Sequence, residues 1–297
     1  MVQDLNDFLD HVNLAELHSK IGQFRDLDFK SMSYQDVQKA VSRVISFDTP
    51  EGNRALLTPA MASYPKGTRF YRVRNIPAND RNLPLKSMSK VSDCWEPPQS
   101  VIDAGHIKAG RLNRANEALI YTTPGNPNVA VEELKVNDGE LFSLIVYEAL
   151  EDIKVVCIGI DVAQEHLSEQ NKLKHTMLQD FLKHEFIRDV GIGTEYLYRI
   201  SESIIKDYFD LPPEWQDGWC YPSVAKKGGF YNVCFRPSIK RKVKLVGTQI
   251  ANVKRIEKDY LFSVKLIAAD LNSDGDLEYY DVGSDAQKQL FPEIRMS

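Results

Sequence analysis

The sequence contains no long apolar run: none approaches the roughly 20 consecutive apolar residues that a membrane-spanning helix requires. The first residues, MVQDLNDFLDHVNL, carry acidic side chains where a secretory signal carries basic ones followed by an apolar core. Cysteine is scarce, and the four cysteines form neither a CxxC pair nor a Cys/His metal pattern. We therefore expect a cytoplasmic protein without a membrane segment, whose cysteines are mostly free thiols in the core.

An excess of positive charge is also absent. The 297 residues carry a formal net charge of -5, which argues against direct binding to nucleic acid because that requires a basic surface. No GxxxxGK[ST] loop, GxGxxG after a strand, GxSxG or HExxH motif is present. These absences leave P-loop ATPases, Rossmann enzymes, α/β-hydrolases and zinc proteases unsupported. The six histidines are dispersed, and we expect no metal cofactor.

Helical and strand patterns follow one another along the chain, which predicts an α+β protein. Apolar residues recur at helical spacing within residues 1–47 and again over 163–188. Residues 68–75, TRFYRVRN, alternate as a strand does, and residues 76–109 form a long loop of the kind that often serves as a lid. Further elements are expected as a helix over 195–209 and strands within 139–160, 230–235 and 241–282.

One acidic segment has two readings. DLNSDGDLEYYD, residues 270–281, matches the acidic spacing of a calcium-binding loop, with Gly275 at the sharp turn. Its flanks have strand rather than helix character, and NSDG is also a strong hairpin-turn sequence. We favour the hairpin turn, and whether the segment binds calcium stays open.

Four short segments stand out for their arginines, tyrosines and carboxylates: RFYRV (69–73), GRLNRANEALIYTT (110–123), VAVEE (129–133) and DGWCYPSVAKKGGFYNVCF (217–235). In this order they resemble the successive blocks of the RES domain family, which is named for its arginine, glutamate and serine. The resemblance covers roughly residues 67–237. The sequence RLNRANEA departs from the family's usual second block, and the chain extends on both sides of the matched region.

The resemblance implies an ADP-ribosyltransferase-like split sheet and an enzyme that consumes NAD. Characterised members cleave NAD by hydrolysis or phosphorolysis, or transfer ADP-ribose to a target. They are toxins of bacterial toxin–antitoxin pairs, so a small helix-turn-helix antitoxin is the implied protein partner. The residues that match the family's motifs are Arg72, Arg111, Tyr121, Glu132, Ser223 and Asn232.

A carboxylate suits this chemistry for a physical reason. The nicotinamide–ribose bond breaks through an oxocarbenium-like transition state, as glycosidic bonds do. A carboxylate beside the ribose stabilises the positive charge as it develops. Glu132 is the predicted catalytic carboxylate. Glu133 is its neighbour, but successive residues on a helix lie about 100° apart, so only one of the two is expected to face a cleft.

The other matching residues would bind the substrate, and Arg72 and Tyr121 are also predicted to be catalytic. The guanidinium groups of Arg72 and Arg111 can donate paired hydrogen bonds to a pyrophosphate. Tyr121 could stack on the nicotinamide ring or close the pocket. Ser223 could donate a hydrogen bond to a phosphate or ribose, and Asn232 matches an asparagine often found after the family's serine.

The sequence therefore predicts three parts: a helical extension over 1–60, an NAD-binding domain over 61–240, and a β-rich extension over 241–297 packed on the core. The leading function is NAD consumption, with water, phosphate or a protein side chain as acceptor. The alternative is a non-catalytic interaction module whose cleft binds a nucleotide or ADP-ribose. A homo-oligomer is compatible with both.

Overall fold

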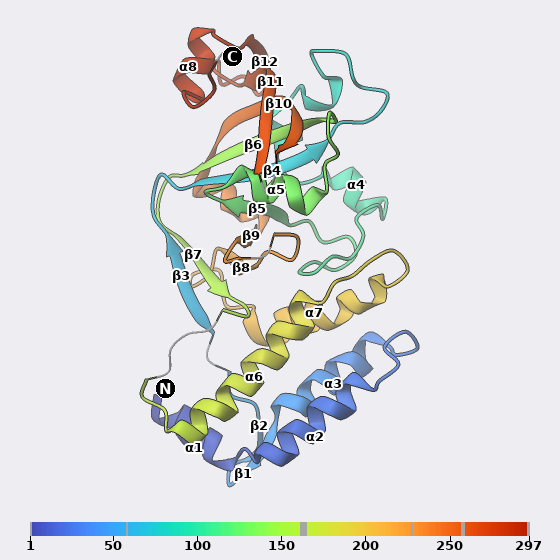
Figure 1. The fold of residues 1–297 in the computed structure, drawn as a ribbon, viewed down its shortest axis with the longest axis vertical. Helices are drawn as coiled ribbons and strands as arrows, with labels where there is room; N and C mark the ends of the chain where they lie inside the picture. Colours follow the sequence, from blue (N-terminus) through green and yellow to red (C-terminus); the bar gives the residue numbers. More distant parts are fainter. Residues whose placement is uncertain (1, 58, 161–164, 227, 257–258, 296–297) are drawn as a thin grey trace. The chain divides into compact units, whose positions relative to one another are not determined.

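A computed structural model describes residues 2–57, 59–160, 165–226, 228–256 and 259–295 (Figure 1). The architecture is mixed α+β, as predicted, and the chain divides into two compact units. Unit 1 comprises Met1–Ala62, Ile107–Glu117 and Val156–Gln216, and unit 2 comprises Ser63–His106, Ala118–Val155 and Asp217–Ser297. One unit boundary, between Ala62 and Ser63, lies close to the predicted boundary near residue 60, whereas none falls near residue 240 and two middle segments belong with the N-terminal helices.

Unit 1 is largely helical. Polar side chains cap three of its helices by accepting backbone N–H groups of the first turn: Asn13, Ser33 and Ser168. The buried apolar residues of α3 recur at helical spacing, which gives that helix one face toward the unit's core. Residues 163 and 164 of the predicted 163–188 helix lie outside the described residues. The elements are α1 (Val2–His11), α2 (Leu14–Arg25), α3 (Tyr34–Ile45), β1 (Phe47–Thr49), β2 (Gly52–Arg54), α6 (Glu169–Ile187), η3 (Glu195–Leu197), α7 (Tyr198–Ile204) and the π-helical turn η4 (Ile205–Phe209).

A buried carboxylate in α6 yields a pH-dependent prediction. The Glu185 side chain is fully buried, and the Arg188 Nη1 lies 3.3 Å from its Oε2. Burial raises the pKa of Glu185 above its ordinary 4.5, opposed by the charges of Arg188, His184 and Arg25. Above about pH 4.5, Glu185 is ionised in the unfolded chain but stays protonated in the folded protein until the pH reaches its raised pKa. The free energy of unfolding of the wild-type protein therefore falls as the pH rises through that interval.

Glu185→Gln removes this ionisation. The variant is therefore expected to raise the free energy of unfolding at pH 7 by about 1 kcal/mol. The difference from wild type should shrink toward zero as the pH falls to about 4. Urea denaturation between pH 4 and 8 measures both, and a destabilised variant at pH 7 would show that the Arg188 pair outweighs the burial of the charge.

Unit 2 is built on an antiparallel sheet. In the ten-stranded order β12-β11-β10-β6-β4-β5-β9-β8-β7-β3, the first eight strands lie within this unit, and the unit boundary falls within β7 (Ile153–Cys157) and within β3 (Ala60–Tyr64). β10 pairs with β6 from Val243↔Ala149 to Asn252↔Leu141. Residues 241–297 therefore continue the sheet rather than only packing on it. The remaining strands are β4 (Arg69–Asn75), β5 (Ile120–Pro124), β6 (Leu141–Ala149), β8 (Gly218–Pro222), β9 (Tyr231–Phe235), β10 (Val243–Ile256), β11 (Asp259–Ala269) and β12 (Glu278–Asp281).

Unit 2 also contains several short helices. The most relevant to the site is α5 (Pro127–Leu134), which follows β5 and begins with an Asn126 cap and a proline, and which ends at Lys135 in the left-handed conformation. Its Val131 packs in a core cluster with Phe142, Val146 and other buried residues of the sheet. The other helices are η1 (Lys86–Met88), η2 (Val91–Cys94), α4 (Gln99–Asp103), η5 (Pro237–Arg241) and α8 (Asp285–Leu290).

The acidic segment at 270–281 contains a hairpin turn. β11 and β12 pair antiparallel across it, from Leu266↔Asp281 to Ala269↔Glu278. The Asp270 carboxylate accepts the backbone N–H groups of Asp274 and Gly275, and Gly275 has φ +91°. The hairpin prediction is confirmed. Residues 257 and 258, within the predicted strand region 241–282, lie outside the described residues.

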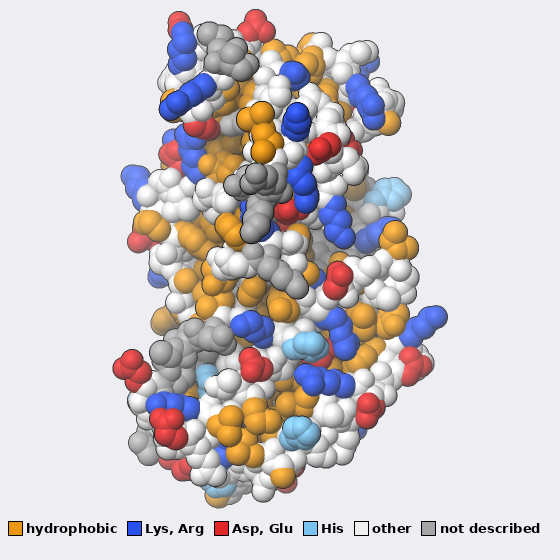
Figure 2. Space-filling model, in the orientation of Figure 1, with side chains coloured by type: hydrophobic (Ala, Val, Ile, Leu, Met, Phe, Trp, Pro, Cys, Tyr) orange, Lys and Arg blue, Asp and Glu red, His pale blue; other side chains and the backbone are white. Residues whose placement is uncertain are grey.

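The surface is chemically mixed. On the face in Figure 2, basic and acidic side chains are interspersed with hydrophobic ones. Within the described part of the chain, no helix combines the length and apolarity needed to cross a membrane.

Candidate functional site

Unit 2 contains a cavity of about 240 Å³ where β4, β5, α5, β8 and β9 meet. The strand pairings bring these elements together: Tyr71 of β4 lies opposite Thr123 of β5, and Tyr121 of β5 lies opposite Cys234 of β9. The volume is below the roughly 300–1,000 Å³ typical of drug-sized ligands, so it suits a ring and sugar rather than a whole dinucleotide. Its polar and aromatic lining consists of Tyr71, Arg72, Tyr121, Thr122, Thr123, Glu133, Tyr221 and Asn232.

A carboxylate with a fixed orientation lies in this lining. Glu133 Oε1 accepts hydrogen bonds from Ser223 Oγ and from Asn232 Nδ2, each at 2.6 Å. Because a carboxylate only accepts, the amide nitrogen of Asn232 must be the atom that faces it. Ser223 Oγ also accepts the backbone N–H of Lys226 at 2.9 Å, which fixes the hydroxyl in turn. Among the described residues Glu133 Oε2 has no hydrogen-bond partner, so it is available to a ligand.

The predicted carboxylate, Glu132, lies elsewhere, and the structure places Glu133 in the pocket instead. Glu132 Oε2 accepts a hydrogen bond from Arg255 Nη2 at 3.0 Å. The helix explains the difference: Ala130, Glu133 and Leu134 all line the cavity at i, i+3 and i+4 spacing, so they share one face of α5. Glu132 lies about 100° away from that face.

Arg72 lies in the pocket, as predicted for a ligand-binding arginine. It comes from β4, and its Nη1 donates a hydrogen bond to the Trp95 carbonyl at 2.7 Å. A guanidinium has five N–H donors. Arg72 also hydrogen-bonds with the Tyr147 side chain, and its remaining N–H groups can bind an anionic ligand.

Three tyrosines line the same cavity. Tyr121 was predicted, whereas Tyr71 and Tyr221 were not, although both lie within the quoted blocks RFYRV and CYPS. Burial is the main cause that raises the pKa of Tyr71, which keeps its hydroxyl protonated and able to donate. Aromatic faces near a carboxylate and a guanidinium suit a planar cationic ring attached to a sugar phosphate.

Arg111 has a different setting. It belongs to unit 1, where its Nη1 donates to the Phe186 carbonyl and, at 3.2 Å, to the Arg188 carbonyl. These carbonyls lie at the C-terminal end of α6, so the guanidinium caps that helix. Arg111 is therefore not part of the cavity within unit 2, and its described contacts are those of a structural arginine.

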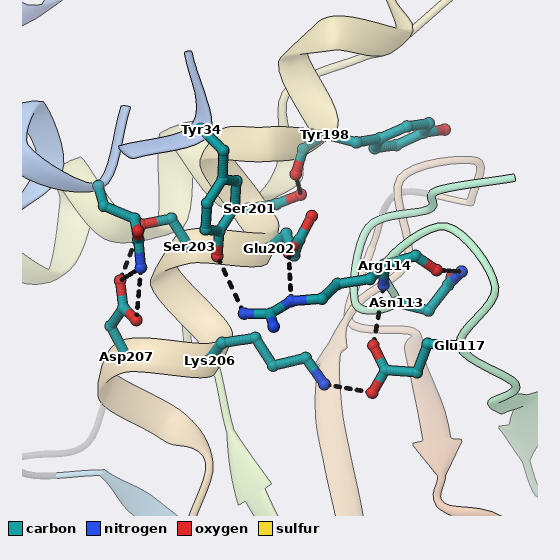
Figure 3. Close-up of polar contacts among 11 residues, drawn as sticks. Tyr34, Asn113, Arg114, Glu117, Tyr198, Ser201, Glu202, Ser203, Lys206 and Asp207 are labelled. Carbon is teal, nitrogen blue, oxygen red and sulfur yellow. Dashed lines mark hydrogen bonds and ion pairs between the residues drawn. The ribbon is translucent and has the colours of Figure 1, made fainter. Parts of the chain in front are cut away.

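A second polar cluster lies close to Arg111 in sequence and belongs to unit 1 (Figure 3). Arg114 Nε donates to Glu202 Oε1 at 2.9 Å, and its Nη2 lies 3.5 Å from the Tyr34 hydroxyl. Lys206 Nζ lies 2.5 Å from Glu117 Oε1, and Glu117 Oε2 accepts the backbone N–H of Arg114. Each charge thus has a partner of opposite sign, and the cluster ties residues 113–117 to α7 and η4. This pattern is that of a structural network.

The structure thus gathers Arg72, Tyr121 and Asn232 of the predicted residues, together with Glu133, in the lining of one cavity, and Ser223 hydrogen-bonds to Glu133. Such a set can bind a sugar phosphate and stabilise a cation formed at the sugar. Comparison of the chain with protein-family models, with curated proteins and with solved structures found no match.

Proposed function

We propose that unit 2 binds NAD with its nicotinamide–ribose end in this cavity and cleaves the bond between nicotinamide and ribose. The observation that carries the proposal is the carboxylate of Glu133, held by Ser223 and Asn232 beside Arg72 and Tyr121. Segments far apart in the sequence supply these residues, and each belongs to a block that resembles the RES family. An ADP-ribosyltransferase-like arrangement of the sheet is part of the proposal.

Each side chain has a role in the proposed reaction. Glu133 Oε2 lies beside the ribose and stabilises the oxocarbenium-like charge that develops as nicotinamide departs. Ser223 and Asn232 hold that carboxylate in place, so little reorganisation accompanies the transition state. Arg72 binds a phosphate oxygen, and Tyr121 contacts the nicotinamide ring. The acceptor is water, phosphate or a protein side chain.

The resemblance to the RES family also suggests a cellular role, namely that of a toxin. Uncontrolled NAD cleavage would arrest growth, so a bacterial chain of this kind would need an inhibitor. A small helix-turn-helix antitoxin that blocks the cavity would serve. Expression of the chain alone is then expected to lower cellular NAD and stop growth.

The direct test is incubation of the purified protein with NAD, with and without phosphate, followed by chromatography. Release of nicotinamide is the expected result. Dependence on phosphate would identify phosphorolysis, and release without phosphate would identify hydrolysis. Binding of ADP-ribose with no release in either buffer, and no ADP-ribose transfer to protein in a cell lysate, would favour the non-catalytic interaction module and contradict the enzyme.

Arg72→Ala is expected to weaken binding of ADP-ribose by about 10- to 100-fold, because it removes a charge-assisted hydrogen bond to phosphate. Isothermal titration calorimetry measures the affinity. The control is Arg241→Ala in the same unit: Arg241 is exposed and is absent from the described cavity lining. Equal losses in both variants would remove the phosphate role from Arg72.

A further inference from the structure

Three consecutive backbone carbonyls follow one another at the end of η2, and each accepts a hydrogen bond from a side chain of the sheet. The Asp93 carbonyl accepts from Arg74 Nη1, the Cys94 carbonyl from Tyr147 Oη, and the Trp95 carbonyl from Arg72 Nη1 at 2.7 Å. The last carbonyls of a helical turn have no partner within it, so these side chains satisfy them. We call residues 93–95 the carbonyl clamp.

Contacts outside the cavity hold the carbonyl clamp in place. The ring of Trp95 lies 4.9 Å from that of Tyr147, measured between centroids, and Lys240 Nζ lies 5.5 Å from the Trp95 ring. Lys240 also forms an ion pair with Glu96 at 2.6 Å. Burial is the main cause that raises the pKa of Tyr147 to about 12, so its hydroxyl keeps the proton that it donates to Cys94.

Arg72 connects the carbonyl clamp to the cavity. Of the three donors, Arg72 is the one that also appears in the described cavity lining. An arginine side chain is flexible, and binding a ligand would require it to lose rotamer freedom. The bond to Trp95 and the interaction with the Tyr147 side chain restrict the guanidinium before the ligand arrives, while N–H groups remain for phosphate.

We infer that the carbonyl clamp positions Arg72 for the phosphates of the ligand, and that Tyr147 and Lys240 are positioning residues that act through it. The inference rests on the proposed function, since it takes NAD or ADP-ribose as the ligand. It assigns a role to the segment 76–109, which was expected to serve as a lid: through residues 93–95 it holds an arginine of the site. Neither Tyr147 nor Lys240 needs to touch the ligand for this role.

The test compares binding of ADP-ribose, which carries a pyrophosphate, with binding of nicotinamide riboside, which carries no phosphate. Tyr147→Phe keeps the ring that contacts Trp95 and removes the hydroxyl that holds the Cys94 carbonyl. In the full-length protein, calorimetry is expected to show about five- to tenfold weaker binding of ADP-ribose. Binding of nicotinamide riboside, which has no phosphate, should stay unchanged. In an Arg72→Ala background, Tyr147→Phe should add no further loss, because the two changes then act through one group.

Lys240→Met is a second, milder variant for the case that Tyr147→Phe does not fold. Lys240 is partly exposed, so this change removes the ion pair with little loss of packing; about a two- to threefold loss for ADP-ribose alone is expected. Unchanged affinity for ADP-ribose in both variants would overturn the inference. So would equal losses for both ligands, or additive losses with Arg72→Ala, since those indicate general damage. Failure of the wild-type protein to bind NAD or ADP-ribose would instead overturn the proposed function and the inference together.

Discussion

Glu133→Gln is expected to lower the rate of nicotinamide release from NAD by at least about 100-fold, while NAD still binds. The amide keeps the shape of the side chain but removes the negative charge that offsets the oxocarbenium-like transition state. Because the charge acts mainly in the transition state, the rate constant should fall far more than the affinity. Chromatographic rates at saturating NAD and calorimetric affinities separate the two quantities.

Glu132→Gln is the matched control, since it makes the same change one residue earlier on α5. Glu132 pairs with Arg255 at 3.0 Å and is absent from the described lining of the cavity. Its variant should retain the wild-type rate within about threefold. A large loss in Glu132→Gln with a normal rate in Glu133→Gln would return the catalytic role to the residue that the family motif marks.

Local sequence patterns predicted much of the fold because the relevant forces act over a few residues. Alternation in TRFYRVRN predicted β4, and helical spacing within residues 1–47 predicted the helices that include α3. The turn signal at 270–281 predicted the hairpin between β11 and β12. The same patterns did not reveal the two units, because three separate segments build each of them.

The site was less accessible to sequence reasoning. Whether Glu132 or Glu133 faces the cavity depends on the rotation of α5, which is set by packing of Val131 against distant strands. Likewise, Arg111 of the GR pair at 110–111 was predicted to bind phosphate, yet it caps α6 through carbonyls 75 and 77 residues away. The spacing of residues within a short motif does not predict contacts between residues that far apart in the sequence. The sequence motifs therefore predicted the types of residue in the pocket, whereas tertiary contacts determine which individual residues lie there.

Arg114→Met is expected to destabilise unit 1 by about 2 kcal/mol. The Glu202 side chain is only 7% exposed, and the Arg114 Nε at 2.9 Å is its described ion-pair partner. Removing the guanidinium leaves a carboxylate away from water without its counter-charge, which is the costly part. The Arg114 side chain itself is 56% exposed, so solvent screens the pair and the expected loss is below that of a fully buried pair. Hydrogen exchange of α7 amides should accelerate about 10- to 100-fold.

Two further variants show whether Glu202 is the cause. Glu202→Gln in the Arg114→Met background replaces the unpaired, buried carboxylate by a neutral amide. This change is expected to restore most of the lost stability. Arg43→Met on α3 removes an exposed arginine of the same unit and should change exchange in α7 little. If the double variant stays as unstable as Arg114→Met, the loss comes from the apolar stem of Arg114 or from its contact with Tyr34. The polar cluster would then hold residues 113–117 by packing rather than by charge.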